Sequence, residues 1–375
     1  MQKALFVGTL LGAAVLNAGC TESSNSPASS TFTPRPTYEN REPAGLTSRL
    51  TGFTVDPEAY FINLANCAPP PARCALPPLY AEFSPLLQRA VVRNAPITLQ
   101  DTVPDPATGR PPDPAPPTLS SAAGLWTLDK VPTRRGPPFF VLSLGSLPTL
   151  PTPPSLANDV PAPFPLPPVP EGNYLPTLTI RPVVPAHSAC VGLEALQVSD
   201  KGILEAVAKY LSSEGTSVTV ADLLNPGRFG GITVFWLYQP GFPVFRVPAP
   251  NTTVEASSGR VLNIEWAPVG APLPPPVAAL QSTRGFFIAP GPPAPHSSLG
   301  LVAIVHPPLM GPPGNVTYTA KDATTSAAEN RPWSLQPLEL PQIPGLVTFA
   351  GLQMAPAVPS ATPSIPPPST CVPGQ

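Results

Sequence analysis

The hydrophobic and polar positions of this chain alternate mainly with the period of two that is typical of β-strands. Runs rich in β-branched and aromatic residues show this alternation, and prolines or glycines bound them. The runs occupy residues 96–101, 125–132, 137–144, 173–182, 231–237 and 299–306. The pattern therefore predicts a mainly β protein with strands in both halves of the chain.

One segment between these halves has the helical period instead. Its apolar positions fall on one face at helical spacing, namely Ile203, Leu204, Val207, Ala208 and Leu211. The spacing predicts an amphipathic helix over residues 200–214. Ser199 or Asp200 is expected to cap its start, and Gly215 is expected to end it. We interpret this helix as packed on a sheet rather than as a recognition helix.

Proline-rich segments separate the strands, since the chain of 375 residues contains 64 prolines. The clusters at 104–117 and 148–170 cannot be central strands, because proline lacks an N–H for the ladder, and they are predicted to be long loops. The chain is 42% hydrophobic with a net charge of −2, which favours folded domains over disorder. It has no basic patch, which argues against a nucleic-acid partner.

We expect two β-sandwich domains of the transthyretin-like or immunoglobulin-like kind, with long proline-rich loops and the amphipathic helix between the two domains. The first spans residues 46–182, and the second spans 183–350 and includes the helix. A proline-rich tail follows at 351–375. Ile97 to Gly124 and Ile232 to Gly259 are both 27 residues, which is consistent with a duplication, but the later spacings differ and leave the repeat open.

The first predicted domain resembles the carboxypeptidase regulatory-like domain, a small transthyretin-like β-sandwich. The residues that carry the pattern are Pro96, Ile97, Leu99, Gly124, Trp126, Leu128, Val131, Pro132, Phe139 and Phe140. Ala123 stands where that family has an acidic residue. The resemblance implies a carrier or adhesion module without an active site. Alternation then places Trp126 and Leu128 on the inner face of their strand, and Leu125 and Thr127 on the outer face.

The N-terminus has the composition of a signal peptide. Lys3 supplies one positive charge, and residues 4–16 are uncharged and largely apolar. A bilayer core requires about 20 apolar residues in a helix, so this run is too short for an ordinary span and suits the apolar region of a signal peptide. The signal is expected to cover residues 1–19.

The residues that follow resemble the lipobox of bacterial lipoproteins. Ala18, Gly19 and Cys20 match that motif, and Asn17 stands where the family usually has leucine. The resemblance implies that Cys20 becomes the acylated N-terminus and anchors the protein in a membrane. Thr21, rather than an aspartate, implies the outer membrane. The alternative is an ordinary secretory signal with a chance cysteine.

Residues 20–45 are rich in serine, threonine and proline and are predicted to form a flexible tether. With the lipid on Cys20, the tether would hold the folded region beside the outer membrane of a Gram-negative bacterium. The folded region would face either the periplasm or the cell surface.

Four further cysteines are expected to form disulfides, because an exported protein meets an oxidising compartment. Cys67 and Cys74 are seven positions apart and would close a local loop, which leaves Cys190 to pair with Cys371. Three connectivities are possible in principle. A zinc site is the rival interpretation, but the cysteines lack C-x-x-C spacing and nearby histidines.

The sequence predicts no catalytic residue, cofactor or metal. His187, His296 and His306 lie in loop-like contexts or at a strand end, and we interpret them as ordinary surface or loop histidines. The chain has no H-E-x-x-H motif and no G-x-S-x-G motif. The aromatic run at 230–245 is interpreted as a buried strand and turn, with an exposed shelf for a glycan or a protein as the alternative.

These features predict a lipid-anchored envelope lipoprotein that acts as a non-catalytic structural or binding module. The membrane, through the lipid on Cys20, is its expected partner, with an envelope protein or a glycan as a further one. Two alternatives remain open. One is a periplasmic hydrolase with its chemistry in the second half, and the other is an accessory lipoprotein for secretion or assembly.

Overall fold

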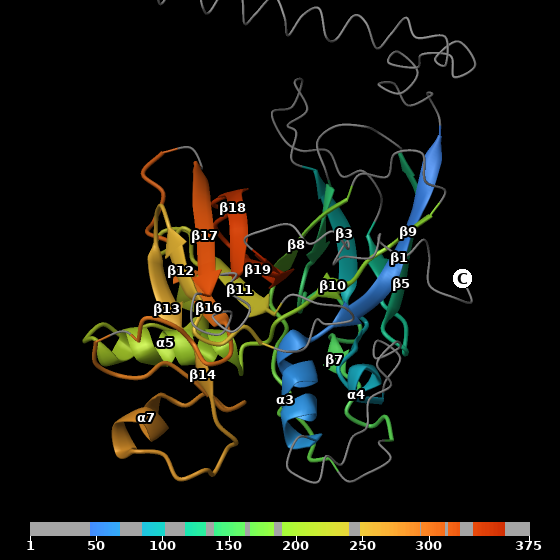
Figure 1. The fold of residues 1–375 in the computed structure, drawn as a ribbon. Coiled ribbons are helices and arrows are strands. Elements are labelled where there is room, and N and C mark those ends of the chain that lie inside the picture. The colour runs from blue at the N-terminus through green and yellow to red at the C-terminus, as the bar shows by residue number, and fades with distance from the viewer. Residues whose placement is uncertain are drawn as a thin grey trace, which may run out of the picture.

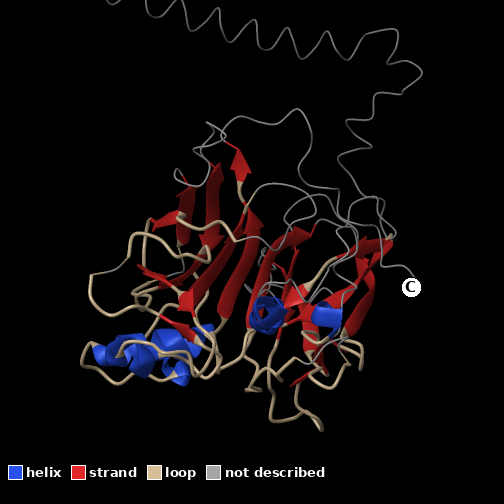
Figure 2. Cartoon of the chain, turned by 60° about the horizontal axis from the view of Figure 1, so that its bottom comes forward, coloured by secondary structure: helices blue, strands red, loops and turns tan. Residues whose placement is uncertain are grey.

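The computed structural model describes residues 46–67, 85–101, 117–132, 139–161, 166–183, 190–239, 248–292, 294–311, 314–322 and 333–356. The protein is mainly β, as the alternation predicts, with several sheets and a few short helices (Figures 1 and 2). The predicted signal peptide, the predicted tether and Cys20 lie outside the described residues. No described helix combines the length and the apolar character that crossing a membrane would need.

The largest sheet has eight strands in the order β13-β16-β11-β19-β8-β6-β3-β4. These strands are β13 (Arg260–Asn263), β16 (Leu301–Val305), β11 (Ile232–Tyr238), β19 (Val347–Gln353), β8 (Thr177–Val183), β6 (Phe139–Ser143), β3 (Pro96–Asp101) and β4 (Thr118–Leu119). β8 pairs in parallel with β19, and β19 pairs in parallel with β11. The hydrogen bonds of one sheet therefore connect the two regions that the sequence predicts as 46–182 and 183–350.

Two four-stranded sheets and two two-stranded ribbons accompany it. In the first four-stranded sheet, β1 (Thr47–Val55) pairs with β5 (Leu125–Pro132), β9 (Cys190–Gly192) and β10 (Ala195–Leu196). The second has the order β12 (Thr253–Ala256), β17 (Asn315–Asp322), β18 (Trp333–Pro341) and β20 (Ala355–Pro356). The ribbons pair β14 (Glu265–Trp266) with β15 (Phe286–Phe287), and β2 (Val92–Arg93) with β7 (Ser155–Leu156).

The described helices are α3 (Pro57–Cys67), α4 (Pro85–Gln88), α5 (Ile203–Ser213), α6 (Val220–Leu223) and α7 (Pro275–Leu280). α5 confirms the predicted amphipathic helix. The expected cap at Ser199 or Asp200 is wrong, because the chain forms a turn there and Gly202 is the residue that precedes the helix, without a side-chain cap. Gly215 ends the helix as predicted, with a φ of +110°.

A first hydrophobic core lies between the β1 sheet and strands β3 and β6. Trp126 is 1% exposed and Leu128 is 3% exposed in this core. Leu125 and Thr127 are half-buried on the other face of β5. The predicted inward orientation of Trp126 and Leu128 is therefore confirmed. Gly52 of β1 lies directly opposite Trp126. Its lack of a side chain lets the backbone of Leu193 pass close by, since a Cβ atom here would overlap the carbonyl oxygen of Leu193.

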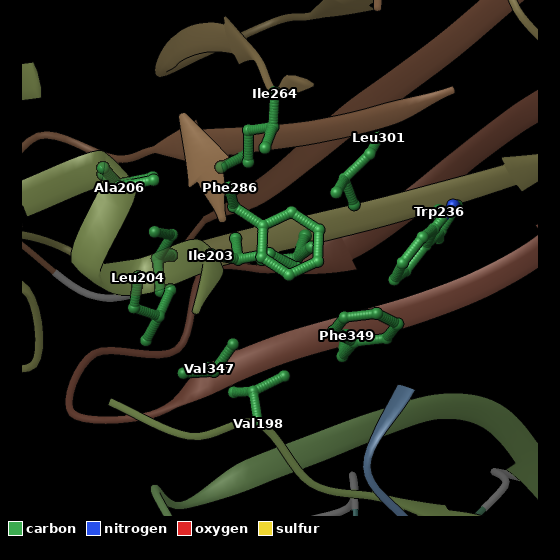
Figure 3. Close-up of a cluster of buried hydrophobic side chains, with 14 of the residues drawn as sticks. Val198, Ile203, Leu204, Ala206, Trp236, Ile264, Phe286, Leu301, Val347 and Phe349 are labelled. Carbon is green, nitrogen blue, oxygen red and sulfur yellow. The ribbon is translucent and has the colours of Figure 1, made fainter. Parts of the chain in front are cut away.

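The other two cores lie on opposite faces of the eight-stranded sheet. One face packs against the β12-β17-β18 layer. The opposite face packs against α3 and α5, where the Phe286 side chain lies among Ile203, Trp236 and Phe349 (Figure 3). Phe235 and Trp236 of β11 are both buried. The interpretation of this aromatic run as a buried strand is thus confirmed over Ile232–Tyr238, while residues 240–247 lie outside the described chain.

Candidate functional site

Two carboxylates and one guanidinium meet where α3 approaches α5 and the turn before β15. Asp56 directly precedes α3, Glu58 lies in its first turn, and Arg284 lies in the turn between α7 and β15. All three side chains are 0% exposed. Fully buried charges are rare in proteins unless they are paired, which makes this cluster the most unusual polar feature of the described fold.

The guanidinium of Arg284 contacts both acids at once. Its Nη1 donates to Asp56 Oδ2 at 2.7 Å and to Glu58 Oε2 at 2.8 Å. Its Nε donates to the carbonyl oxygen of Pro170 at 2.9 Å. The hydroxyl of Tyr174 donates to Asp56 Oδ2 at 2.9 Å. The two bonds from Arg284 to the acids join segments more than 200 residues apart in the sequence, and the bonds to Pro170 and from Tyr174 each span more than 100 residues. We call these four side chains (Asp56, Glu58, Tyr174 and Arg284) the Arg284 cluster.

The local sequence explains why both acids are present. Asp56 caps α3, since its Oδ1 accepts the backbone N–H of Ala59 at 2.9 Å, and Pro57 occupies the first helical position, where proline is favoured. Glu58 in the first turn suits the positive end of the helix dipole. The same Glu58 accepts the backbone N–H of Ile203 at 2.8 Å and so caps a second helix, α5.

Glu58 provides the cap that the sequence assigned to Ser199 or Asp200. The approach of this side chain requires a glycine before α5. A Cβ atom on Gly202 would lie 1.8 Å from Glu58 Oε2, which is far inside any contact distance.

The electrostatics of the Arg284 cluster favour one extra proton. Burial raises the pKa of Glu58 from 4.5 to about 7, and the nearby charge of Asp56 adds to this, while the charge of Arg284 opposes it. Burial also raises the pKa of Tyr174 well above its usual value, so this phenol stays neutral. Burial alone would lower the pKa of Arg284, but the charges of Asp56 and Glu58 raise it, so the guanidinium keeps its charge.

A second buried polar group lies between the eight-stranded sheet and the β12-β17-β18 layer. His306 follows β16, and its Nε2 is 3.1 Å from Thr233 Oγ1 and 3.0 Å from the hydroxyl of Tyr318. The two hydroxyl oxygens are 3.1 Å apart. Burial lowers the pKa of His306 to about 4, so the imidazole is neutral at neutral pH. We call these three side chains the His306 cluster.

His306 directly follows β16, at the predicted strand end, but the expected surface position is wrong, because the residue is only 1% exposed. Its two partners are hydroxyls of threonine and tyrosine, not the serine, cysteine or carboxylate that a hydrolase of the usual kind needs beside its histidine. His296 is half-buried in the loop before β16, and His187 lies outside the described residues.

The predicted cysteine pairs lie partly outside the described chain. Cys67 is the last residue of α3, and Cys190 begins β9, where its backbone lies opposite Arg49 of β1. Cys74 and Cys371 lie outside the described residues. The pairs Cys67–Cys74 and Cys190–Cys371 therefore stay predictions. Within the described ranges, no group of three or more histidine, cysteine, aspartate or glutamate side chains is placed to hold a metal ion.

Comparison with known proteins finds no relative of this chain. No protein-family model matches the chain, and no curated protein and no solved structure matches it either.

Sequence reasoning missed the Arg284 cluster. The stretch Asp56-Pro57-Glu58 carries a recognisable signature of a helix start, with a capping acid, a proline and an acid in the first turn. No helix is predicted here from the sequence, although this signature indicates the start of α3. It does not indicate the partner of these acids, because Arg284 is 226 residues beyond Glu58.

Proposed function

We propose that the protein is a lipid-anchored lipoprotein of the outer membrane whose folded part is a non-catalytic structural or binding module. The observation that carries this proposal is the succession of a short apolar run and Ala18-Gly19-Cys20. Acylation of Cys20 would bury long alkyl chains in the bilayer, and each buried CH₂ contributes about 0.8 kcal/mol. Two or three chains hold a protein stably on a membrane.

The position of the first described strand supports this arrangement. The start of β1 lies at the end of the molecule opposite α5 and α7 (Figure 1). The proposed tether of residues 20–45 would join the fold at this end, because it directly precedes β1 in the sequence. A flexible chain of this length has an end-to-end distance of roughly 25–30 Å, which is enough to separate the fold from a membrane surface.

The polar interior supports a non-catalytic module. The acids of the Arg284 cluster are bound by a guanidinium, a phenol and backbone N–H groups, and the imidazole of the His306 cluster is bound by two hydroxyls. The charged and titratable groups of both clusters are almost fully buried. This arrangement fits the stabilisation of a fold better than the binding of a substrate.

We propose two β-sandwich units as the finer architecture of this module. The first would pair the β1 sheet with strands β3 and β6 around Trp126, in the manner of the transthyretin-like resemblance. The second would pair strands β11 and β16 with the β12-β17-β18 layer. The separate cores around Trp126 and around Tyr318 support this division, and the shared eight-stranded sheet would join the two units.

The lipid anchor is tested by comparing the native chain with Cys20→Ala and Thr21→Asp in a Gram-negative host. Cells are fed an alkyne-tagged fatty acid, and the membranes are separated by density. We expect the native chain to be labelled and to sediment with the outer membrane, and Cys20→Ala to be unlabelled and to keep the mass of the precursor. Thr21→Asp should be labelled but retained at the inner membrane.

One outcome would contradict the lipid anchor. A Cys20→Ala chain that keeps the native mass and still sediments with membranes would show that Cys20 carries no lipid. Chemical cross-linking in intact envelopes, followed by mass spectrometry, then distinguishes a structural module from a secretion or assembly accessory, which would be cross-linked to its machinery.

A further inference from the structure

The Arg284 cluster holds one more acid than base. Asp56 and Glu58 share the single guanidinium of Arg284, and all three side chains are 0% exposed. With both acids ionised, the buried cluster would carry a net charge of −1. An uncompensated charge away from water is strongly unfavourable. The cluster therefore becomes neutral by taking up one proton.

The hydrogen bonds indicate which acid takes this proton. Asp56 accepts from three donors, namely the N–H of Ala59, the hydroxyl of Tyr174 and Nη1 of Arg284. Glu58 accepts from two, the N–H of Ile203 and the same Nη1. Donors to a carboxylate stabilise its ionised form. Glu58 has fewer of them and is the better proton acceptor.

We propose that Glu58 is a proton-binding latch between α3 and α5, which holds the start of α5 firmly when it is protonated and loosens it when the proton leaves. The proton matters at this junction because Glu58 caps α5 from inside a fully buried cluster that already holds the charge of Asp56. The bonds from Ile203 and Arg284 by themselves favour the ionised form, and burial outweighs them. Loss of the proton leaves a buried negative charge between the two helices. This inference does not depend on the lipid anchor, and its test is separate.

The other charged side chains near this junction have partners of their own. Asp200 accepts the backbone N–H of Asn173, and Lys201 lies 3.9 Å from Asp200. Glu205 on α5 accepts the backbone N–H of Thr283 and pairs with Lys209 at 3.1 Å. The hydrogen bonds and ion pairs of these groups are therefore made outside the Arg284 cluster.

The phenol of Tyr174 stays neutral, since burial raises its pKa. Within the Arg284 cluster, titration near neutral pH therefore falls to Glu58.

The direction of the pH effect follows from the raised pKa of Glu58. In the folded chain this pKa is about 7, against 4.5 for a free glutamate. The folded state thus holds a proton that the unfolded state has lost between these two values. The stabilisation from Glu58 is complete below about pH 4.5 and is lost as the pH rises through about 7.

The full chain and its Glu58→Gln variant are compared to test the latch. A glutamine keeps an oxygen that can accept the N–H of Ile203, and it mimics the protonated acid without titrating. Denaturant unfolding is measured for both chains from pH 4.5 to 8. We expect the unfolding constant of the native chain to rise relative to that of Glu58→Gln on the order of a hundredfold across this range. A ratio that stays constant would overturn the proposal.

Two measurements on the native chain keep the test valid if the variant does not fold. Hydrogen exchange at the first turn of α5, corrected for intrinsic rates, should accelerate above pH 7 relative to the amides of β16. The ¹³C shift of the Glu58 carboxyl carbon should titrate with a midpoint near 7. A midpoint near 4.5, or exchange at α5 that follows β16 at every pH, would contradict the latch.

Discussion

The Arg284 cluster and the His306 cluster are two ways of keeping polar side chains inside one protein. The Arg284 cluster uses charges, and it joins two helices and a turn from distant parts of the sequence. The His306 cluster is neutral, and it joins side chains of neighbouring layers around β11, β16 and β17. The comparison shows that burial has opposite consequences for an acid and for a base.

Burial disfavours the charged form of every titratable group. For Glu58 this raises the pKa to about 7, so the folded state gains a proton. For His306 it lowers the pKa to about 4, so the folded state loses one. Acidification therefore increases the contribution of the Arg284 cluster to the stability of the fold and decreases the contribution of the His306 cluster. Between about pH 4.5 and 6.5 the two clusters change the free energy of unfolding in opposite directions. The pH dependence of the native chain therefore shows only their difference.

The largest effect is expected from Arg284→Met, which removes the charge that compensates two buried acids. We expect a loss of about 3–5 kcal/mol in the free energy of unfolding at pH 8, because truncating one partner of a buried ion pair leaves the other charges uncompensated. Denaturant unfolding of the full chain measures this loss.

The matched control is the same substitution in the Glu58→Gln background, where one acid has already been neutralised. Arg284→Met should then cost about 1–2 kcal/mol less, since residues in direct contact are energetically coupled. Equal costs in the two backgrounds would show that Arg284 acts through its packing rather than through its charge.

The next largest effect is a change in the pH dependence of stability, which distinguishes the two clusters. The neutral imidazole of His306 contributes stability that is complete above about pH 6.5 and is lost as the pH falls toward 4. A Glu58→Gln chain should therefore lose about 2–3 kcal/mol on acidification from pH 6.5 to 4, since the opposing effect of Glu58 has been removed.

A His306→Gln chain should show the reverse slope, and it should become more stable as the pH falls from 7 to 4.5. Unfolding curves at half-unit steps of pH measure both slopes. Two variants with the same slope would contradict the assignment of these opposite effects to Glu58 and His306.

The parts of this fold that could be predicted from the sequence are those set by neighbouring residues. The period of 3.6 predicts α5, and the alternation around Trp126 predicts which side of β5 is buried. The stretch Asp56-Pro57-Glu58 likewise carries the local signature for the start of α3. Such features depend on residues a few positions apart.

The features that sequence reasoning missed depend on distant residues. Strand β8 was expected to close the first domain, yet it pairs with β19, about 170 residues further on and continues one sheet through both regions. The hydroxyls of Thr177 and Thr179 in β8 accept the backbone N–H groups of Val198 and Leu196. Nothing in the spacing of these residues predicts such contacts, because the tertiary fold alone brings them together.

The smallest effect is expected at the surface ion pair of Arg260 and Glu214, which is bidentate, whereas Arg284 reaches its two acids through a single Nη1. Arg260 binds both carboxylate oxygens of Glu214 and lies 5.2 Å from the ring centre of Tyr210, but its side chain is 46% exposed and that of Glu214 is 41% exposed. Water and salt screen such a pair, so Glu214→Gln should cost less than about 1 kcal/mol and less again at high salt. Unfolding at low and at high ionic strength measures this. A cost equal to that of Arg284→Met would mean that bidentate geometry, rather than burial, determines the strength of these pairs.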